Sequence, residues 1–373
     1  MSQRNYGIDF LRIVSMFMVL LLHVLLNDGL INRDVINTSY WVSWFIEISA
    51  YGAVNCFALI SGYVMCNSNP KISKLFSLWL QIVFYTVGFF VLFAIINHKF
   101  NLYAFIENCL PISTKRYWYT SAYFGMFFLI PLLNSAVNNI EKKVFEKVLV
   151  VCFLCFCIRA SLIPLSNEPF NLGGGYSTLW LSLMYITGAY IKKYNVTEKI
   201  KKPAAIIIYA VMTVLTFLSK VVIHYLTQAF LEKPFWTDIF VSYISPSIVL
   251  ASIGLFIFCL KLSYSDVAKK FISFFAPASL GVFLIHTNGN IWSNVINKIQ
   301  LHLIEHNPVI TVVLVFATAA AIYIVCSLIE IGRIYLFKAL KINKLCLALE
   351  AILQKIYDKL YSRFVKEDET ASV

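Results

Sequence analysis

The stretch IDFLRIVSMFMVLLLHVLLND, residues 8–28, is long and apolar enough to cross a lipid bilayer, yet it carries Asp9, Arg12 and His23. About 20 apolar residues in a helix span a hydrocarbon core of about 30 Å. An ionisable group inside such a segment is costly, and it is rarely found there without a partner or a function. The stretch therefore predicts a transmembrane helix with a polar stripe along it.

The composition extends the membrane prediction to the whole chain of 373 residues. Hydrophobic residues make up 60% of it, charged residues only 13%, and the mean hydropathy is +0.75. Such a composition excludes a soluble globular protein. We predict an all-α integral membrane protein, a polytopic bundle of about ten transmembrane helices. Their expected limits are 8–28, 40–66, 75–97, 119–138, 145–163, 175–191, 204–227, 238–260, 271–292 and 308–335.

The basic residues between the spans predict the orientation. Most of the 31 Lys and Arg residues fall in segments that are cytoplasmic if the N-terminus is inside, so both termini are expected in the cytoplasm. This distribution explains the net charge of +12 without a nucleic-acid partner. We expect one transmembrane domain, residues 1–338, and a cytoplasmic amphipathic tail, residues 339–373. The tail either lies on the inner leaflet of the bilayer or packs as a cytoplasmic cap.

Helical geometry places the polar groups of the first span on one face. Asp9 and Arg12 are three residues apart and can form an ion pair. Arg12 and His23 are separated by about three turns and a rise of about 16 Å, so both side chains point the same way. The simpler alternatives are an Arg12 that extends to the membrane surface and a His23 that only bonds to a neighbouring helix.

Arg12 and His23, with ten residues between them, resemble the first-span pattern of the bacterial acyltransferase family 3. Its members are integral membrane proteins that transfer acyl groups, commonly acetyl, to cell-surface carbohydrates. Further blocks resemble the family in the same order, and the likeness is greatest to the surface-polysaccharide O-acyltransferase-like subgroup. These blocks are VNCFALISGYVM (54–65), YWYTSAYFGMFFLIPLLN (117–134), GGGYSTLWLSLMYITGAYIKKY (173–194) and SLGVFLIHTN (279–288).

The resemblance implies an O-acyltransferase of the bacterial inner membrane that uses acetyl-CoA as donor and a hydroxyl of a cell-surface or lipid-linked glycan as acceptor. Arg12, Lys71 and Lys74 would then bind the acyl-CoA, and Asp9 would orient Arg12. The two lysines replace a family Arg-x-x-Arg pair, keeping the charge but not the bidentate fork. His23 would be catalytic, either as general base or as a nucleophile that accepts the acyl group transiently.

Other polar groups are weaker candidates. Glu47, Trp118 and His286 are candidates for the acceptor side, and each has a simpler reading. Glu47 could be solvated, Trp118 could anchor the chain at the membrane interface, and His286, at a depth comparable to His23, could be a packing residue.

The remaining polar groups inside spans are expected to have structural roles. Lys220 is expected to extend its ammonium group to the membrane surface, and Glu330 with Arg333 to form a structural pair. No metal is expected, because the three cysteines within residues 152–157 lie in an apolar run without other ligands and pack as small hydrophobes.

A secondary transporter or flippase for a lipid-linked or acylated substrate is the alternative function. Buried charges would then line a transport pathway. Many transporters are built from inverted repeats, but the polar pattern of the first five expected spans does not recur in the last five. The acyltransferase is therefore the favoured prediction.

Overall fold

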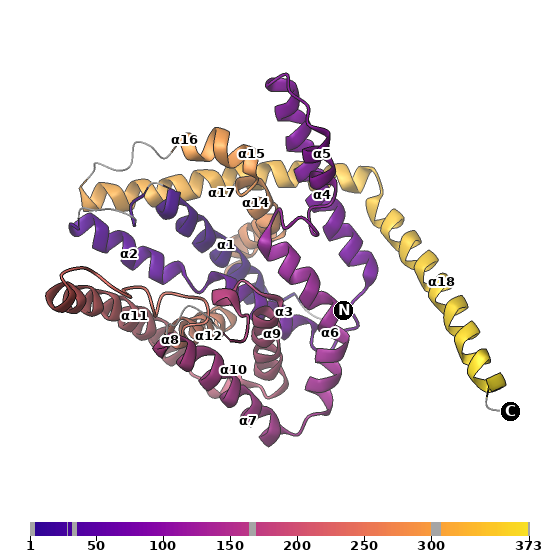
Figure 1. Cartoon of the computed structure of the whole chain (residues 1–373), viewed down its shortest axis with the longest axis horizontal. Coiled ribbons are helices and arrows are strands. Elements are labelled where there is room, and N and C mark those ends of the chain that lie inside the picture. The colour runs from indigo at the N-terminus through magenta and orange to yellow at the C-terminus, as the bar shows by residue number, and fades with distance from the viewer. Residues whose placement is uncertain (1–3, 28, 32–35, 164–168, 300–306, 372–373) are drawn as a thin grey trace.

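A computed structural model describes residues 4–27, 29–31, 36–163, 169–299 and 307–371. These residues form helices and their connections, with no strand among them, so the all-α prediction is confirmed (Figure 1). The helices are α1 (Tyr6–Asn27), α2 (Thr38–Ala50), α3 (Ala53–Met65), α4 (Ile72–Ile96), α5 (Leu102–Cys109), α6 (Trp118–Asn139), α7 (Lys142–Cys152), a π-helix (Phe153–Ile158), α8 (Arg159–Leu162), a 3-10 turn (Gly173–Gly175), α9 (Thr178–Lys193), α10 (Val196–Lys199), α11 (Lys202–Leu231), α12 (Pro246–Leu260), α13 (Asp266–Phe275), a 3-10 turn (Ala276–Ala278), α14 (Ser279–His286), α15 (Gly289–Ile291), a π-helix (Trp292–Ile296), α16 (Asn297–Ile299), α17 (Pro308–Ala339) and α18 (Ile342–Ala371).

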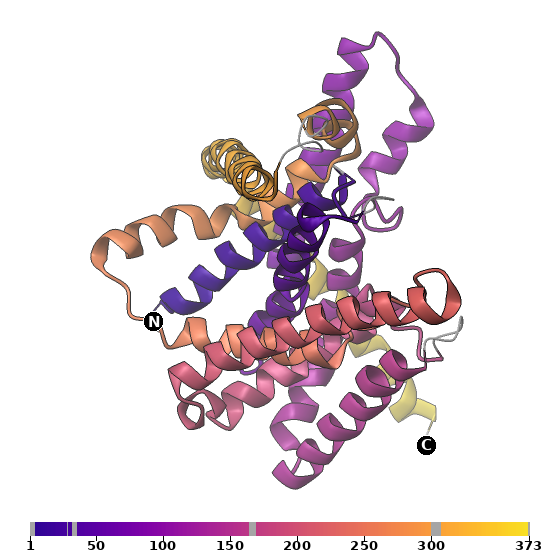
Figure 2. The same cartoon turned by 90° about the vertical axis from the view of Figure 1, so that its left-hand side faces the viewer.

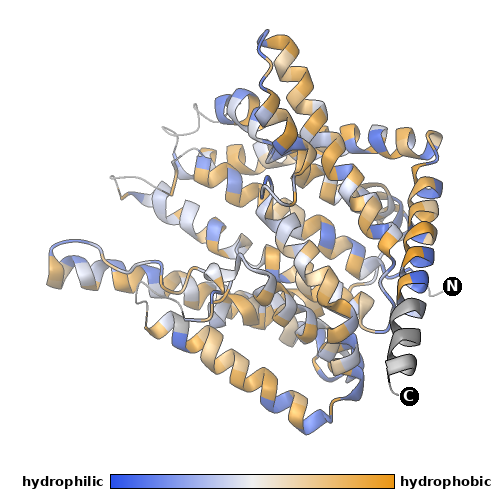
Figure 3. Ribbon diagram, turned by 45° about the vertical axis from the view of Figure 1, so that its right-hand side comes forward, coloured by the Kyte–Doolittle hydropathy of each residue, from blue (hydrophilic) through white to orange (hydrophobic). Residues whose placement is uncertain are grey.

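Seven helical segments of the described chain are long and apolar enough to cross a membrane. Each matches one of the predicted spans, and Figure 3 shows how apolar residues dominate the long helices. The protein is therefore a multi-pass membrane protein. The segments are Tyr6–Asn27, Thr38–Met65, Ile72–Ile96, Trp118–Asn139, Lys202–Leu231, Asp266–His286 and Pro308–Ala339.

The three other predicted spans are helical but shorter or interrupted. The span expected at 145–163 is divided among α7, a π-helix and α8, and the one at 175–191 is the 16-residue α9. The start expected at residue 238 is wrong, because α12 begins at Pro246, whose missing N–H suits a first helical turn. The total of ten spans, and the even number that would place both termini on one side, stay predictions.

Helix α1 lies at the centre of the bundle. It packs against α2, α3, α12, α13, α14 and α17, whereas α4 and α11 lie at the periphery and bury only a small share of their residues. Figures 1 and 2 place α4 with α5 on one side of the bundle and α11 on the other. The polar stripe of α1 therefore faces other helices and not the lipid.

Glycines allow α3 and α9 to approach each other backbone to backbone. A Cβ atom on Gly62 would lie 1.8 Å from the carbonyl oxygen of Tyr185, and one on Gly188 would lie 2.2 Å from that of Leu59. Small residues at such contacts are typical of helix pairs in membranes, where close packing replaces the hydrophobic effect as the main attraction. The Ser-Gly-Tyr and Thr-Gly-Ala sequences of the two family-like blocks thus have a packing role.

Gly62→Ala is expected to destabilise the protein by about 1–3 kcal/mol, because the new methyl group overlaps backbone that cannot move without separating the two helices. The apparent melting temperature of the detergent-solubilised protein measures this effect. Gly88→Ala in α4 is the matched control, since a Cβ there meets no atom within 4 Å. Equal melting temperatures for the two variants would contradict the packing argument.

Two buried asparagines connect the family-like blocks to one another. The Asn55 amide donates to the carbonyl of Tyr243 (2.8 Å) and accepts from the indole of Trp180 (2.9 Å). Asn134 accepts from the Tyr185 hydroxyl (2.8 Å). Buried polar groups need such partners, and these bonds connect α3, α6, α9 and the segment before α12.

The tail forms a helix, α18, that leaves the bundle (Figure 1). It packs against α4 and α17 near its start, and a hydrogen bond with Ser73, helped by the charge of Lys71, lowers the pKa of Glu350. Glu350 thereby meets the N-terminus of α4, where negative charge is favoured. Further along, apolar residues such as Leu353 and Ile356 are exposed, and their contact with the inner leaflet stays a prediction.

Candidate active site

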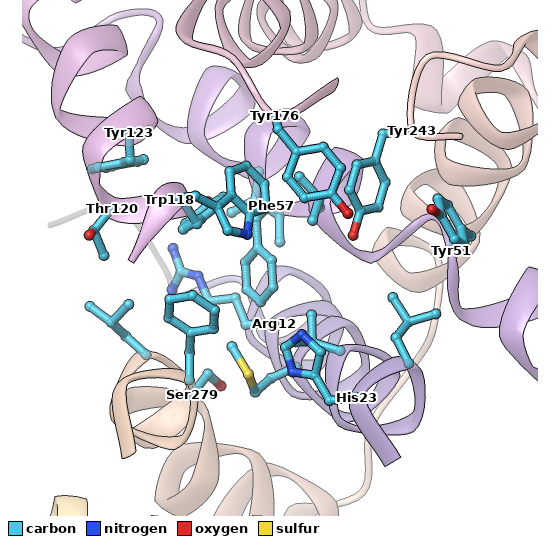
Figure 4. Close-up of a pocket in the computed structure, with 18 of the residues that line it drawn as sticks. Arg12, His23, Tyr51, Phe57, Trp118, Thr120, Tyr123, Tyr176, Tyr243 and Ser279 are labelled. Atoms are coloured by element: carbon cyan, nitrogen blue, oxygen red, sulfur yellow. The ribbon is translucent and has the colours of Figure 1, made fainter. Parts of the chain in front are cut away.

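A cavity of about 780 Å³ opens beside α1 and is walled by α1, α2, α3, α4, α6 and α14 (Figure 4). Its lining contains residues that the sequence predicts to be functional and that come from four different helices. These residues are Arg12, His23, Glu47, Lys74 and Trp118. The predicted donor-side and acceptor-side residues, apart from Lys71 and His286, therefore border one common space.

One face of α1 forms a wall of this cavity. Arg12, Met16, Val19 and His23 all line it, which is the spacing of three and four residues that a single helical face requires. Figure 4 shows Arg12 and His23 extending from the same helix into the pocket. The predicted common face of Arg12 and His23 is confirmed.

A carboxylate fixes the position of Arg12. One oxygen of Asp9 accepts from Arg12 Nη1 at 2.8 Å, and the other accepts from Arg4 Nε at 2.6 Å. Asp9 is buried and does not line the cavity, so it lies behind Arg12. The Asp9–Arg12 pair is confirmed. A guanidinium has five N–H groups, so this contact leaves donors of Arg12 for a ligand.

His23 contacts a second histidine from a distant part of the sequence. His23 Nδ1 lies 2.8 Å from His286 Nε2, and His286 Nδ1 lies 2.6 Å from the carbonyl oxygen of Val282. The Trp292 ring packs nearly perpendicular to the His23 ring, at 86°, with the centroids 5.6 Å apart. His286 is 1% exposed and does not line the cavity, so it contacts His23 and not the cavity space.

Aromatic rings form another wall of the cavity. Trp118 and Tyr176 have ring centroids 4.4 Å apart, Tyr176 and Tyr243 5.1 Å, and Tyr51 and Tyr243 4.9 Å. Figure 4 shows Trp118, Tyr176 and Tyr243 side by side across the pocket from His23. Because α6, the segment before α9 and the segment before α12 each supply one of these three rings, the wall exists only in the folded bundle.

A charged cluster borders the cavity near these rings. Lys220 forms an ion pair with Asp238, and its ammonium group lies 3.4 Å above the ring of Trp44. Lys220 is 1% exposed, so the expected extension to the membrane surface is wrong. The Asp238 carboxylate and the face of Trp44 supply the compensation that makes its burial feasible. Next to this pair, Glu47 is buried, and its Oε2 atom has no hydrogen-bond partner among the described residues.

The model of acyltransferase family 3, an acyltransferase domain, matches residues 5–329. The chain belongs to the acyltransferase 3 family. This match covers the predicted blocks and the whole cavity wall, and it confirms the resemblance at the level of the family. Together with the membrane-spanning helices, it makes the protein a membrane acyltransferase.

No curated protein and no solved structure matches the sequence. The roles of single residues in this acyltransferase therefore rest on its own geometry.

Three predicted site residues of the acyltransferase lie outside the cavity wall: Asp9 and His286, described above, and Lys71. Lys71 immediately precedes α4, near Glu350 of the tail, and it is Lys74, one turn later, that lines the cavity.

The structural pair Glu330–Arg333 is confirmed. Its guanidinium donates at 2.6 and 2.9 Å to a carboxylate that also binds Gln81, away from the cavity.

Several residues of the site were absent from the sequence-based prediction. Asp238, Tyr243, Tyr176 and Tyr51 line the cavity, and all four lie in connections between helices. The only signal in the sequence was the pair of charges Lys220 and Asp238, which lie 18 residues apart on either side of a Pro-containing turn.

Proposed function

We propose that this acyltransferase transfers an acetyl group from acetyl-CoA to a hydroxyl of a cell-surface or lipid-linked glycan, as in the surface-polysaccharide subgroup, in the bacterial inner membrane. The observation that carries the proposal is the arrangement of one cavity. The cations of Arg12 and Lys74, here called the cationic end, the imidazole of His23, and the aromatic wall with Glu47 border the same space, and Glu47 Oε2 has no hydrogen-bond partner among the described residues.

The cationic end suits the donor. Arg12 and Lys74 come from different helices but line one cavity, and the Asp9 carboxylate, shared with Arg4, takes one N–H group of Arg12, so that its other donors can reach a ligand. Arginine and lysine bind phosphate through charge-assisted hydrogen bonds. If basic loops face the cytoplasm, this end opens towards the compartment where acetyl-CoA is made. Lys71, beside the N-terminus of α4, adds positive charge near Lys74.

His23 suits the acyl-transfer step as a general base. It accepts the proton of the acceptor hydroxyl while that oxygen forms a bond to the thioester carbonyl carbon. The carbon–sulfur bond then breaks, and the imidazolium returns the proton to the leaving thiolate, giving the acetyl ester and free CoA. This sequence needs a neutral imidazole that borders both substrates, and His23 lies on the cavity wall. An acetyl-imidazole intermediate is the alternative use of the same lone pair.

The aromatic wall suits a sugar acceptor. Sugar rings present C–H faces that pack on aromatic rings and hydroxyl groups that donate hydrogen bonds. Trp118, Tyr176 and Tyr243 supply the first kind of surface, and Glu47 supplies the second with a buried carboxylate oxygen that has no partner among the described residues. A buried acceptor atom without a bond costs about 1–3 kcal/mol, which a donor group on the ligand would recover.

The test uses the purified full chain in lipid vesicles with radiolabelled acetyl-CoA and a membrane glycolipid extract. We expect release of free CoA together with label in an alkali-labile ester of the glycolipid. A transporter or flippase would instead move label or lipid across the bilayer without releasing CoA. That outcome would overturn the proposed function in favour of the alternative.

A further inference from the structure

His286 contacts His23 and not the cavity, and its own hydrogen bonds determine where its proton lies. The carbonyl of Val282 can only accept, and it lies 2.6 Å from His286 Nδ1, so this nitrogen carries a proton and donates it. His286 is 1% exposed, and among the described residues no carboxylate contacts it. An unpaired buried charge is costly, so the ring is neutral. Its Nε2 atom is therefore an unprotonated acceptor.

The same reasoning extends to His23. His286 Nε2 and His23 Nδ1 are 2.8 Å apart, a distance that requires one proton between them. Since His286 Nε2 has none, His23 Nδ1 supplies it. A neutral imidazole has one N–H, so the lone pair of His23 is on Nε2. The partner of one ring nitrogen thus decides the state of the other.

We infer that His286 is a positioning residue that holds His23 in the Nδ1–H tautomer and keeps its Nε2 lone pair available for the substrates in the cavity. This inference rests on the proposed role of His23 in acyl transfer. When His23 becomes an imidazolium, its Nδ1–H still donates to His286, so the same bond stabilises the charged state. A third residue that orients a catalytic imidazole is a recurrent feature of nucleophile–base sites.

The surrounding packing supports a fixed orientation. Trp292 packs nearly perpendicular to the His23 ring, and Phe283 packs nearly perpendicular to the His286 ring, with centroids 6.1 Å apart. The Tyr117 hydroxyl donates to the Leu284 carbonyl (2.9 Å) and accepts from Asn288 (3.1 Å), which ties the C-terminal end of α14 to the start of α6. The helix that carries His286 is therefore held on both sides of it.

The test compares two variants in the purified full chain. His286→Leu keeps the bulk but removes the acceptor, and we expect kcat to fall by about 10²- to 10⁴-fold, the usual contribution of a positioned base. His286→Gln places an amide oxygen near the position of Nε2, and we expect it to recover about tenfold over the leucine variant. The KM for acetyl-CoA should stay unchanged in both, because Arg12 and Lys74 are untouched.

A second measurement reads the tautomer directly. Nitrogen-15 spectra of the histidine-labelled protein in lipid, with His23→Gln used to assign its signal, should show a protonated Nδ1 and a bare Nε2 for His23. An Nε2–H form in the wild type would overturn the inference, as would wild-type kcat in folded His286→Leu or equal losses in the leucine and glutamine variants. If instead His23→Ala stays active, the proposed catalytic role of His23 fails while the acyl transfer itself stands, and the spectra still decide the tautomer.

Discussion

Replacing His23 with alanine is expected to lower kcat by about 10²- to 10⁴-fold or more, because the substitution removes the group proposed to move the proton in both halves of the reaction. The KM for acetyl-CoA should stay near the wild-type value. His23 and Arg12 are about 16 Å apart along α1, so the phosphate-binding end is unaffected. Release of CoA at saturating acetyl-CoA and acceptor measures kcat, and immunoblotting of membranes measures the amount of folded protein.

The control for this substitution is another histidine that the cavity does not involve. His98 is exposed in the connection between α4 and α5 and has a positive φ of 51°, so His98→Asn suits its backbone. This variant should keep wild-type kcat. If His23→Ala also kept it at normal abundance, His23 would have no catalytic role, and the acyl transfer would need another base.

The central features of this site follow from local periodicity, which is why the sequence predicts them. Asp9, Arg12 and His23 lie on one helix, so their spacing alone determines that they share a face, and any surrounding bundle preserves it. Glu47 and Trp118 could be placed only as candidates, because their helices were predictable but the approach of those helices to α1 was not.

The contacts that complete the site depend on tertiary packing. His286 and His23 are 263 residues apart, and the sequence indicates a common depth in the membrane but not the 2.8 Å contact. The apolar run predicts Asp238 and Tyr243 within a continuous span that begins at residue 238. The chain instead turns between α11 and α12, with Glu232 and Trp236 at positive φ. An apolar run longer than the helix that it contains conceals such a turn.

Replacing Arg12 with glutamine is expected to raise the KM for acetyl-CoA by about 10- to 100-fold while changing kcat little. A hydrogen bond to a charged group contributes about 1.5–3 kcal/mol, and each 1.4 kcal/mol corresponds to about tenfold in affinity. The substitution also removes one of the two arginines that bind Asp9 and leaves Arg4. It therefore lowers the positive charge at the cationic end of the cavity. Initial rates over a range of acetyl-CoA concentrations measure the effect.

Acetyl-pantetheine makes this prediction specific, since it carries the thioester without the nucleotide and its phosphates. Wild type and Arg12→Gln should use it with equal KM if Arg12 binds phosphate. A matched variant at the other end, Glu47→Gln, should leave the KM for acetyl-CoA unchanged and raise that for the glycan. An equal rise in the KM for acetyl-CoA and for acetyl-pantetheine in Arg12→Gln would contradict a phosphate contact of Arg12. The guanidinium would then support the shape of the cavity through Asp9, and Lys74 alone would bind the phosphates.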